Sequence, residues 1–286
     1  MRGFRGAVCA ASSGGKAGAR RTPYGERNVT TARDFVMPTT GIETGLSVSL
    51  SSQLALERRL GTLADNVANS GTVGFRATHV RFAEIEQRVT GGDESQTTSF
   101  ASRGRSVLSP TAGTLVETGA RLDVAIKGEG WFALQGAAGK IMTRDGRFQM
   151  DAEGQLRSVN GDEVLDPGGA PLALNVAAGP PTIGSDGSIV QNGQQVGAIG
   201  LYAFDPGTDP VRIGTSGILA QGAPVALVDG DAPSVLQGYV EQANVDPVRE
   251  MTNLITIHRT FDNVAAMVRK SDAALEKMMQ ILGGNR

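Results

Sequence analysis

The sequence is poor in the residues that form covalent links, membrane spans and nucleic-acid surfaces. Its single cysteine, Cys9, cannot form a disulfide within the chain, so stability must come from buried apolar side chains. No stretch approaches the roughly eighteen consecutive apolar residues of a transmembrane helix, which argues against a membrane span. A net charge of −2 and 5% aromatic residues give no electrostatic reason to expect a nucleic-acid partner.

Candidate catalytic residues are also scarce. Histidine occurs only as His79 and His258, and the second lies inside a helical pattern rather than in a loop where it could approach a substrate. The spacing Gly128-x-Gly130-x-x-Ala133 has the outline of a dinucleotide fingerprint, but the residues that follow the glycines have the pattern of a strand and not of the required helix. We therefore expect no enzyme activity, no cofactor and no metal site.

A long helix is predicted near the C-terminus. Asp246 can cap its free amides, Pro247 suits the first helical position, and Gly283-Gly284 is a typical stop. Two positions of its apolar pattern are polar. In a coiled coil such residues fix the register of the paired helices more than they stabilise the pair, so the helix is expected to select a particular partner. The pattern has the alternating steps of three and four of a coiled-coil seam: Met251, Leu254, His258, Phe261, Ala265, Val268, Asp272, Leu275, Met279 and Leu282.

A second helix is predicted from about Thr44 to Asn69, where Ser70-Gly71 ends it. Because it has one apolar stripe and a polar back, that stripe must be buried against something. The helix either packs on the central part of its own chain or pairs with the C-terminal helix, its own or a neighbour's. The stripe consists of Leu46, Leu50, Leu54, Leu56, Leu60, Leu63 and Val67.

The middle of the chain is predicted to be an antiparallel β domain, because strand patterns alternate with turn residues about every ten positions. The clearest hairpin signal is Asp145-Gly146, between strand patterns at 141–144 and 147–150. Residues 76–118 are too polar for a prediction beyond a loop at Gly91–Ser95. Further turns are predicted at Gly128–Gly130, Ala152–Gly154, Asn160-Gly161, Asp186-Gly187 and Asn192-Gly193.

Residues 1–41 differ in composition from the rest. They carry seven basic and two acidic residues, a net charge of +5, among glycine, serine and alanine, which is typical of a disordered segment. They lack the apolar run of a secretory signal peptide. An organelle transit peptide is one interpretation. We favour the other, that the segment precedes the true start and that Met37 is a later start, because no helical apolar stripe is present.

Four blocks of sequence resemble the flagellar rod, hook and hook-associated axial proteins. The most specific is Ala64–Arg76, which is similar to the family signature A-N-N-x-A-N-x-x-T-x-G-F-K/R through Asn66, Asn69, Thr72, Gly74 and Phe75. The other three blocks are Thr118–Phe132, Thr143–Phe148 and Leu236–Asp246. Together they cover the chain from about Ile42 to Leu282, whereas the basic leader has no counterpart in the family.

The resemblance implies an α+β fold in which the N- and C-terminal long helices pair as a coiled coil beside the central antiparallel all-β domain. It implies four segments: the leader at 1–41, the N-terminal helix of a helical assembly domain at 42–75, the β domain at 76–240, and the C-terminal helix at 241–286. In this interpretation the two helical stripes carry assembly and the signature residues form a hinge between helix and β domain.

The same resemblance implies a structural subunit of the bacterial flagellar basal body that contributes to motility. Total length and a compact middle point to the short members of the proximal rod. The expected partners are other rod subunits, further copies of the chain, and the flagellar type III export apparatus, which would deliver it without a cleaved signal to the rod that crosses the periplasm. Two rivals remain, a distal rod subunit of the same family and a β-rich module that binds a cell-envelope polymer.

Overall fold

The computed structural model describes residues 39–82, 84–89, 96–102, 104–227 and 233–283. The chain divides into two units, Met1–Pro38 and Thr39–Arg286. The first unit lies outside the described residues, and so do the interpretations of the basic leader, of Met37 as a start and of a loop at Gly91–Ser95.

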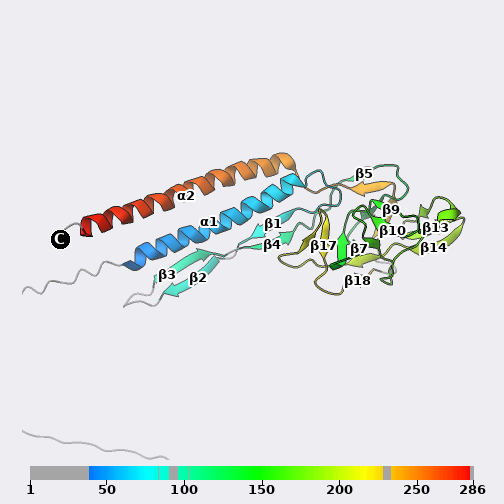
Figure 1. Cartoon of the computed structure of the whole chain (residues 1–286), viewed down its shortest axis with the longest axis horizontal. Coiled ribbons are helices and arrows are strands. Elements are labelled where there is room, and N and C mark those ends of the chain that lie inside the picture. Colours follow the sequence, from blue (N-terminus) through cyan, green and yellow to red (C-terminus); the bar gives the residue numbers. More distant parts are fainter. Residues whose placement is uncertain (1–38, 83, 90–95, 103, 228–232, 284–286) are drawn as a thin grey trace, which may run out of the picture. The chain divides into compact units, whose positions relative to one another are not determined.

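Two long helices belong to this unit, α1 (Thr39–Ala68) and α2 (Pro247–Gly283). They contact each other and run side by side in Figure 1. The predicted ends of α2 are confirmed, and Asp246 Oδ1 accepts hydrogen bonds from Val248 N at 3.1 Å and Arg249 N at 3.2 Å. Helix α1 begins at Thr39, five residues before the predicted Thr44.

All strand pairs are antiparallel within the part of the chain that is described. Two small ladders adjoin α1: β1 (Thr78–Arg81) with β4 (Arg105–Leu108), and β2 (Glu84–Val89) with β3 (Gln96–Ala101). Two more link distant segments: β5 (Leu115–Glu117) with β20 (Tyr239–Glu241), and β6 (Val124–Lys127) with β19 (Ser234–Gln237). The described parts of the stretch 76–118, which could not be predicted beyond one loop, therefore contain strands β1 to β5.

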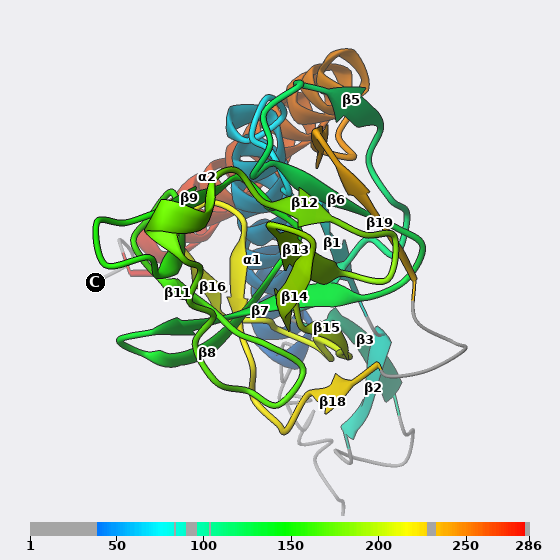
Figure 2. The same ribbon diagram turned by 90° about the vertical axis from the view of Figure 1, so that its right-hand side faces the viewer.

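The remaining strands form two sheets. The larger comprises β7 (Trp131–Gly136), β8 (Gly139–Thr143), β9 (Phe148–Met150), β10 (Leu156–Ser158), β11 (Glu163–Val164), β15 (Leu201–Ala203), β16 (Arg212–Ile213), β17 (Gly217–Leu219) and β18 (Val225–Ala226). The smaller comprises β12 (Thr182–Ile183), β13 (Ser188–Gln191) and β14 (Gln194–Ala198), preceded by the short 3-10 helix η1 (Val176–Ala178). Figure 2 views these strands with the two helices behind them. The α+β class is thus established.

Four of the predicted turns join paired neighbouring strands. The turns at 152–154, 160–161, 186–187 and 192–193 connect β9 to β10, β10 to β11, β12 to β13 and β13 to β14. At the last of them Asn192 and Gly193 have φ angles of 53° and 76°, the left-handed backbone that Asn-Gly turns require. These hairpin predictions are confirmed.

The hairpin predicted at Asp145-Gly146 is wrong. Strand β8 pairs with β7 and β17, and β9 pairs with β10, so the two strands beside this turn belong to different ladders. The backbone at Gly146 instead accepts a hydrogen bond from Val124 N at 3.0 Å, and a Cβ there would lie 1.8 Å from Val124 O. Glycine at this position therefore allows two segments that are distant in sequence to approach closely, and it does not form a tight hairpin turn.

The turn at Gly128–Gly130 does connect two strands, but these strands do not pair with each other. The strands on its two sides are β6 and β7, and β6 pairs with β19, which lies more than a hundred residues later in the sequence. Pairing between such distant segments cannot be recognised from turn residues, because only local spacing enters that prediction.

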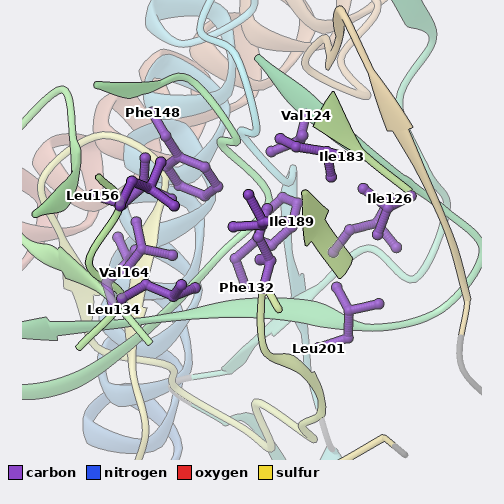
Figure 3. Close-up of a cluster of buried hydrophobic side chains, with 14 of the residues drawn as sticks. Val124, Ile126, Phe132, Leu134, Phe148, Leu156, Val164, Ile183, Ile189 and Leu201 are labelled. Carbon is purple, nitrogen blue, oxygen red and sulfur yellow. The ribbon is translucent and has the colours of Figure 1, made fainter. Parts of the chain in front are cut away.

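The main hydrophobic core lies between the two sheets of the β domain (Figure 3). Phe132 is fully buried and packs edge-to-face on Phe148, with ring centroids 5.3 Å apart. The core is drawn from residues 124–235, from Val124 in β6 to Val235 in β19. Among the described residues no helix is both long enough and apolar enough to cross a membrane.

Candidate functional site

The signature segment after α1 is held by hydrogen bonds to β1. The buried side chain of Asn66 exchanges two hydrogen bonds with the backbone of Thr78: Asn66 Nδ2 donates to Thr78 O, and Thr78 N donates to Asn66 Oδ1, both at 3.0 Å. Asn69 Nδ2 donates to Asp65 O at 2.9 Å, and Thr72 Oγ1 donates to Asn69 Oδ1 at 3.3 Å. The two asparagines thus satisfy backbone groups at the helix end and after it.

Gly74 and Phe75 join this segment to the β domain. Gly74 has a φ angle of 72°, and a Cβ there would lie 2.2 Å from Asp145 N, so no other residue fits. Its N–H donates to Glu241 O at 2.7 Å. Phe75 is buried, and the guanidinium carbon of Arg212 lies 4.4 Å from the centre of its ring. The segment is therefore fixed by close backbone contact and by an aromatic anchor.

A buried cluster of three charges lies beside these residues. Arg76 Nη2 is 2.9 Å from Glu241 Oε1, and Arg144 Nη1 is 3.5 Å from Glu241 Oε2. The side chains of Arg76 and Arg144 are each 4% exposed and that of Glu241 is 1% exposed. We call Arg76, Arg144 and Glu241 the junction triad. One carboxylate thus serves two arginines in a site that excludes water.

Burial sets the electrostatics of the triad. It lowers the pKa of Arg144 to about 10, against the opposing effect of Glu241 and with the added repulsion of Arg76. Burial also lowers the pKa of Arg76, again opposed by Glu241. Both arginines stay charged at neutral pH, and each guanidinium carbon lies 5.9 Å from the ring centre of Trp131. The triad therefore carries a net positive charge next to the chain's single tryptophan.

Backbone contacts complete the junction. Arg76 Nη1 donates to Pro110 O at 3.0 Å and also to Thr111 O, while Arg144 Nη2 donates to Gly128 O at 2.6 Å. Glu241 Oε1 accepts from Gly113 N at 2.9 Å. Loops of the β domain thus meet part of the remaining hydrogen-bonding capacity of the buried charges, whereas Arg76 Nε, Arg144 Nε and Glu241 Oε2 have no hydrogen-bond partner among the described residues.

Asn244 links the same loops to the segment just before α2. Its Oδ1 accepts from Ala77 N at 2.7 Å, and its Nδ2 donates to Thr111 O at 2.6 Å. The residues of the junction come from all four blocks that resemble the axial family. Sequence reasoning identified the blocks but missed the triad, because charge pairing over such distances leaves no local pattern. The signal available was a charged residue inside three of the blocks.

The predicted apolar stripe of α2 is reproduced at every second position. Leu254, Phe261, Val268 and Leu275 are partly buried, as a seam against α1 would require. At the alternate positions Ile257, 6% exposed, takes the place predicted for His258, which is exposed and lies 3.1 Å from Asp262. Ala265 is partly buried, Met251, Asp272 and Met279 are exposed, and the side chain of Leu282 lies outside the described part.

The stripe of α1 is also divided. Leu63 is buried, and Leu56, Leu60 and Val67 are partly buried. Leu50 and Leu54 are 55% and 48% exposed, and the side chain of Leu46 is not among those described. The chain therefore covers part of each predicted stripe itself and leaves another part open, and the role of these residues in assembly stays a prediction.

Comparison with known proteins gives two family matches. Residues 236–281 match the family described as "Flagellar basal body rod FlgEFG protein C-terminal", and residues 125–194 match the "Flagellar hook protein FlgE/F/G D1 domain". The first match spans Glu241 and most of α2. The second covers most of the strands from β6 to β13. These matches define the class of the molecule as an axial protein of the flagellar rod and hook.

Whole-chain relatives are more specific. The flagellar basal-body rod protein FlgF of Mesorhizobium japonicum is 49% identical over 242 residues, covering 85% of this chain and 99% of the relative. That of Rhizobium meliloti is 46% identical, covering 86% and 100%. The rod protein FlgG of Agrobacterium fabrum is 31% identical, covering 79% and 95%.

The chain belongs to the FlgF family of flagellar basal-body rod proteins. Its function is that of a structural subunit of the flagellar basal-body rod. The relatives are structural proteins, and no catalytic family is indicated.

Proposed function

We propose that the chain is built into the proximal part of the rod through α1 and α2, which pair as a coiled coil and contact the helices of neighbouring subunits. The observation that carries the proposal is the division of each apolar stripe. Leu50 and Leu54 on α1, and Met251 and Ile255 on α2, are more than two-fifths exposed in the single chain. Exposed apolar side chains grouped on long helices are typical of surfaces that another molecule covers.

A non-closing contact between copies or homologous subunits would turn such helices into a filament, as expected for a rod. Delivery by the flagellar export apparatus without a cleaved signal, and a position in the rod where it crosses the periplasm, belong to the same proposal. The central β domain would then lie outside the helical layer.

We expect that replacing Leu50 and Leu54 with aspartate abolishes motility while the isolated subunit stays folded. Two charges on the open part of the stripe would have to be desolvated between subunits, whereas in the single chain they stay in water. Swimming of a deletion strain complemented with L50D/L54D, circular dichroism of the purified variant and electron microscopy of basal bodies measure the two effects. Val196→Asp, on an exposed side chain of β14, is the matched control.

Replacing Leu60 and Leu63 with aspartate tests the covered part of the stripe. Because Leu63 is buried within the chain, these two substitutions should disturb the packing of α1 on α2 and also abolish incorporation into the rod, while the β domain stays folded.

Normal motility of the L50D/L54D strain would show that the open stripe does not carry assembly.

A further inference from the structure

The junction triad joins three parts of the chain that are far apart in sequence. Arg76 lies after α1, Arg144 directly follows β8, and Glu241 ends β20. Asp246, which caps α2, lies five residues after Glu241, so only a short segment separates the residue that completes the triad from the second helix. The position of α2 beside α1 therefore depends on the segment that carries Glu241.

Without Glu241 the junction would hold two buried arginines with no buried opposite charge, and only the exposed Glu129 would still act on Arg144. Burial already disfavours the charged form of each arginine, and the positive charge of Arg76 further disfavours the charge on Arg144. Leaving a buried charge without its partner is strongly destabilising in proteins. The closed junction is therefore unfavourable until Glu241 is in place.

The β domain does not share this dependence. Its main core is formed by residues 124–235, so every residue of that core precedes Glu241 in the chain. Glu241 is brought to the junction by the pairing of β20 with β5, with Val240 opposite Val116. The core and the junction are thus separate sets of contacts, completed at different points of the sequence.

We infer that the junction triad is a charge-controlled switch that fixes the two helices to the β domain only when the C-terminal segment has arrived. In a chain that lacks the segment from Tyr239 onward, the β-domain core is folded but the junction stays open. Helix α1 then has no partner helix, and its orientation relative to the β domain is not fixed. Helix presentation, and with it competence for assembly, is therefore coupled to completion of the chain. This inference concerns the closing of the junction and does not rest on which neighbour the helices contact.

Trp131 supplies an internal reporter. It is the only tryptophan in the chain, and both arginines of the triad lie 5.9 Å from its ring centre. Opening of the junction removes the two charges from the indole and admits water. Its fluorescence spectrum and its quenching by acrylamide therefore respond to the junction. Because Trp131 also packs against the β domain, beside Phe204, amide exchange in the core is needed to separate the two effects.

The test uses the full-length chain with Glu241→Gln, which keeps the shape of the side chain and removes its charge. We expect red-shifted and more quenchable emission from Trp131. We also expect at least tenfold faster hydrogen exchange at Gly74 N and Gln242 N, which donate to Glu241 O at 2.7 Å and to Thr114 O at 2.9 Å. The core amides of Leu165 and Leu172 should exchange as in the unchanged chain.

Two further variants keep the inference falsifiable. Glu117→Gln changes an exposed carboxylate on the same strand pair and should behave as the unchanged chain. Replacing Arg76, Arg144 and Glu241 together with methionine removes all three charges and should close the junction again. The inference is overturned if E241Q keeps the original fluorescence and protection, if its core amides lose protection equally, or if the triple variant stays as open as E241Q.

Discussion

Gly74 shows how much of the junction depends on one missing side chain. Both its left-handed backbone conformation and the close approach of Asp145 N disfavour a side chain at this position. Any side chain there would push the segment after α1 away from β8, and the hydrogen bond from Gly74 N to Glu241 O would break with it.

We expect Gly74→Ala to lower the free energy of unfolding by at least about 2 kcal/mol, because a backbone clash adds to the roughly 1 kcal/mol that a left-handed non-glycine residue costs. Chemical denaturation measures the loss. Gly119→Ala is a matched control: its φ is 70°, but no atom lies within 4 Å of its Cβ position, so only the backbone cost should appear. Equal losses in the two variants would show that the contact with Asp145 is unimportant.

Single residues also mark the limit of the sequence analysis. Asn66, Asn69, Gly74 and Phe75 could be singled out because a family signature contains them, and the amides of both asparagines do bond backbone groups. Arg76 closes that same signature, yet its partner Glu241 could not be assigned. A charged side chain looks solvated in a sequence until the segment that buries it is known.

At the scale of elements, α2 separates an inner face from an outer face. Ile257 is 6% exposed, whereas Ile255, two residues earlier, is 53% exposed. The two isoleucines have the same volume and the same helix propensity. Their difference is therefore a measure of packing alone.

We expect Ile257→Ala to destabilise the helix pair by about 2–4 kcal/mol, the usual loss for a large buried aliphatic side chain. Ile255→Ala should change stability by less than about 0.5 kcal/mol, because in the single chain this side chain faces water. Thermal and chemical denaturation followed by far-UV circular dichroism compare the two. Similar losses would contradict the inner face described here.

The elements also explain which predictions succeeded. Hairpins with turns at Asn160-Gly161 and Asn192-Gly193 were predictable because the strands on either side of each turn pair with each other. Asp145-Gly146 is the same kind of turn signal, but β8, which precedes it, pairs with β7 and β17 and not with the strand that follows. The shift from His258 to Ile257 has a similar cause, since a heptad pattern allows two phases and only packing selects between them.

At the scale of the whole molecule, the two helices and the β domain are stabilised to different degrees. The β domain encloses a core with fully buried residues such as Phe132 and Val164. The helix pair covers only part of the apolar stripe on each helix, and Leu50, Leu54 and Met251 remain exposed. Regions with few buried apolar contacts open at lower free energy than a closed core.

We therefore expect the helices to lose structure before the β domain on heating. Hydrogen exchange resolved by residue should give lower protection in α2 than at the core amides of β7 and β8, and the far-UV helix signal should fall before the near-UV signal of the buried aromatic residues. A single transition, coincident for both probes, would show that helices and β domain unfold together.

The order of elements has one more consequence. Since α1 ends and α2 begins at the same junction, the whole β domain is an insertion between two antiparallel halves of a helical hairpin (Figure 1). Residues can be added to its outer turns, or removed from them, without changing the distance between the two helices. The outer part of the β domain can therefore vary in size and sequence while the distance between the two helices stays constant.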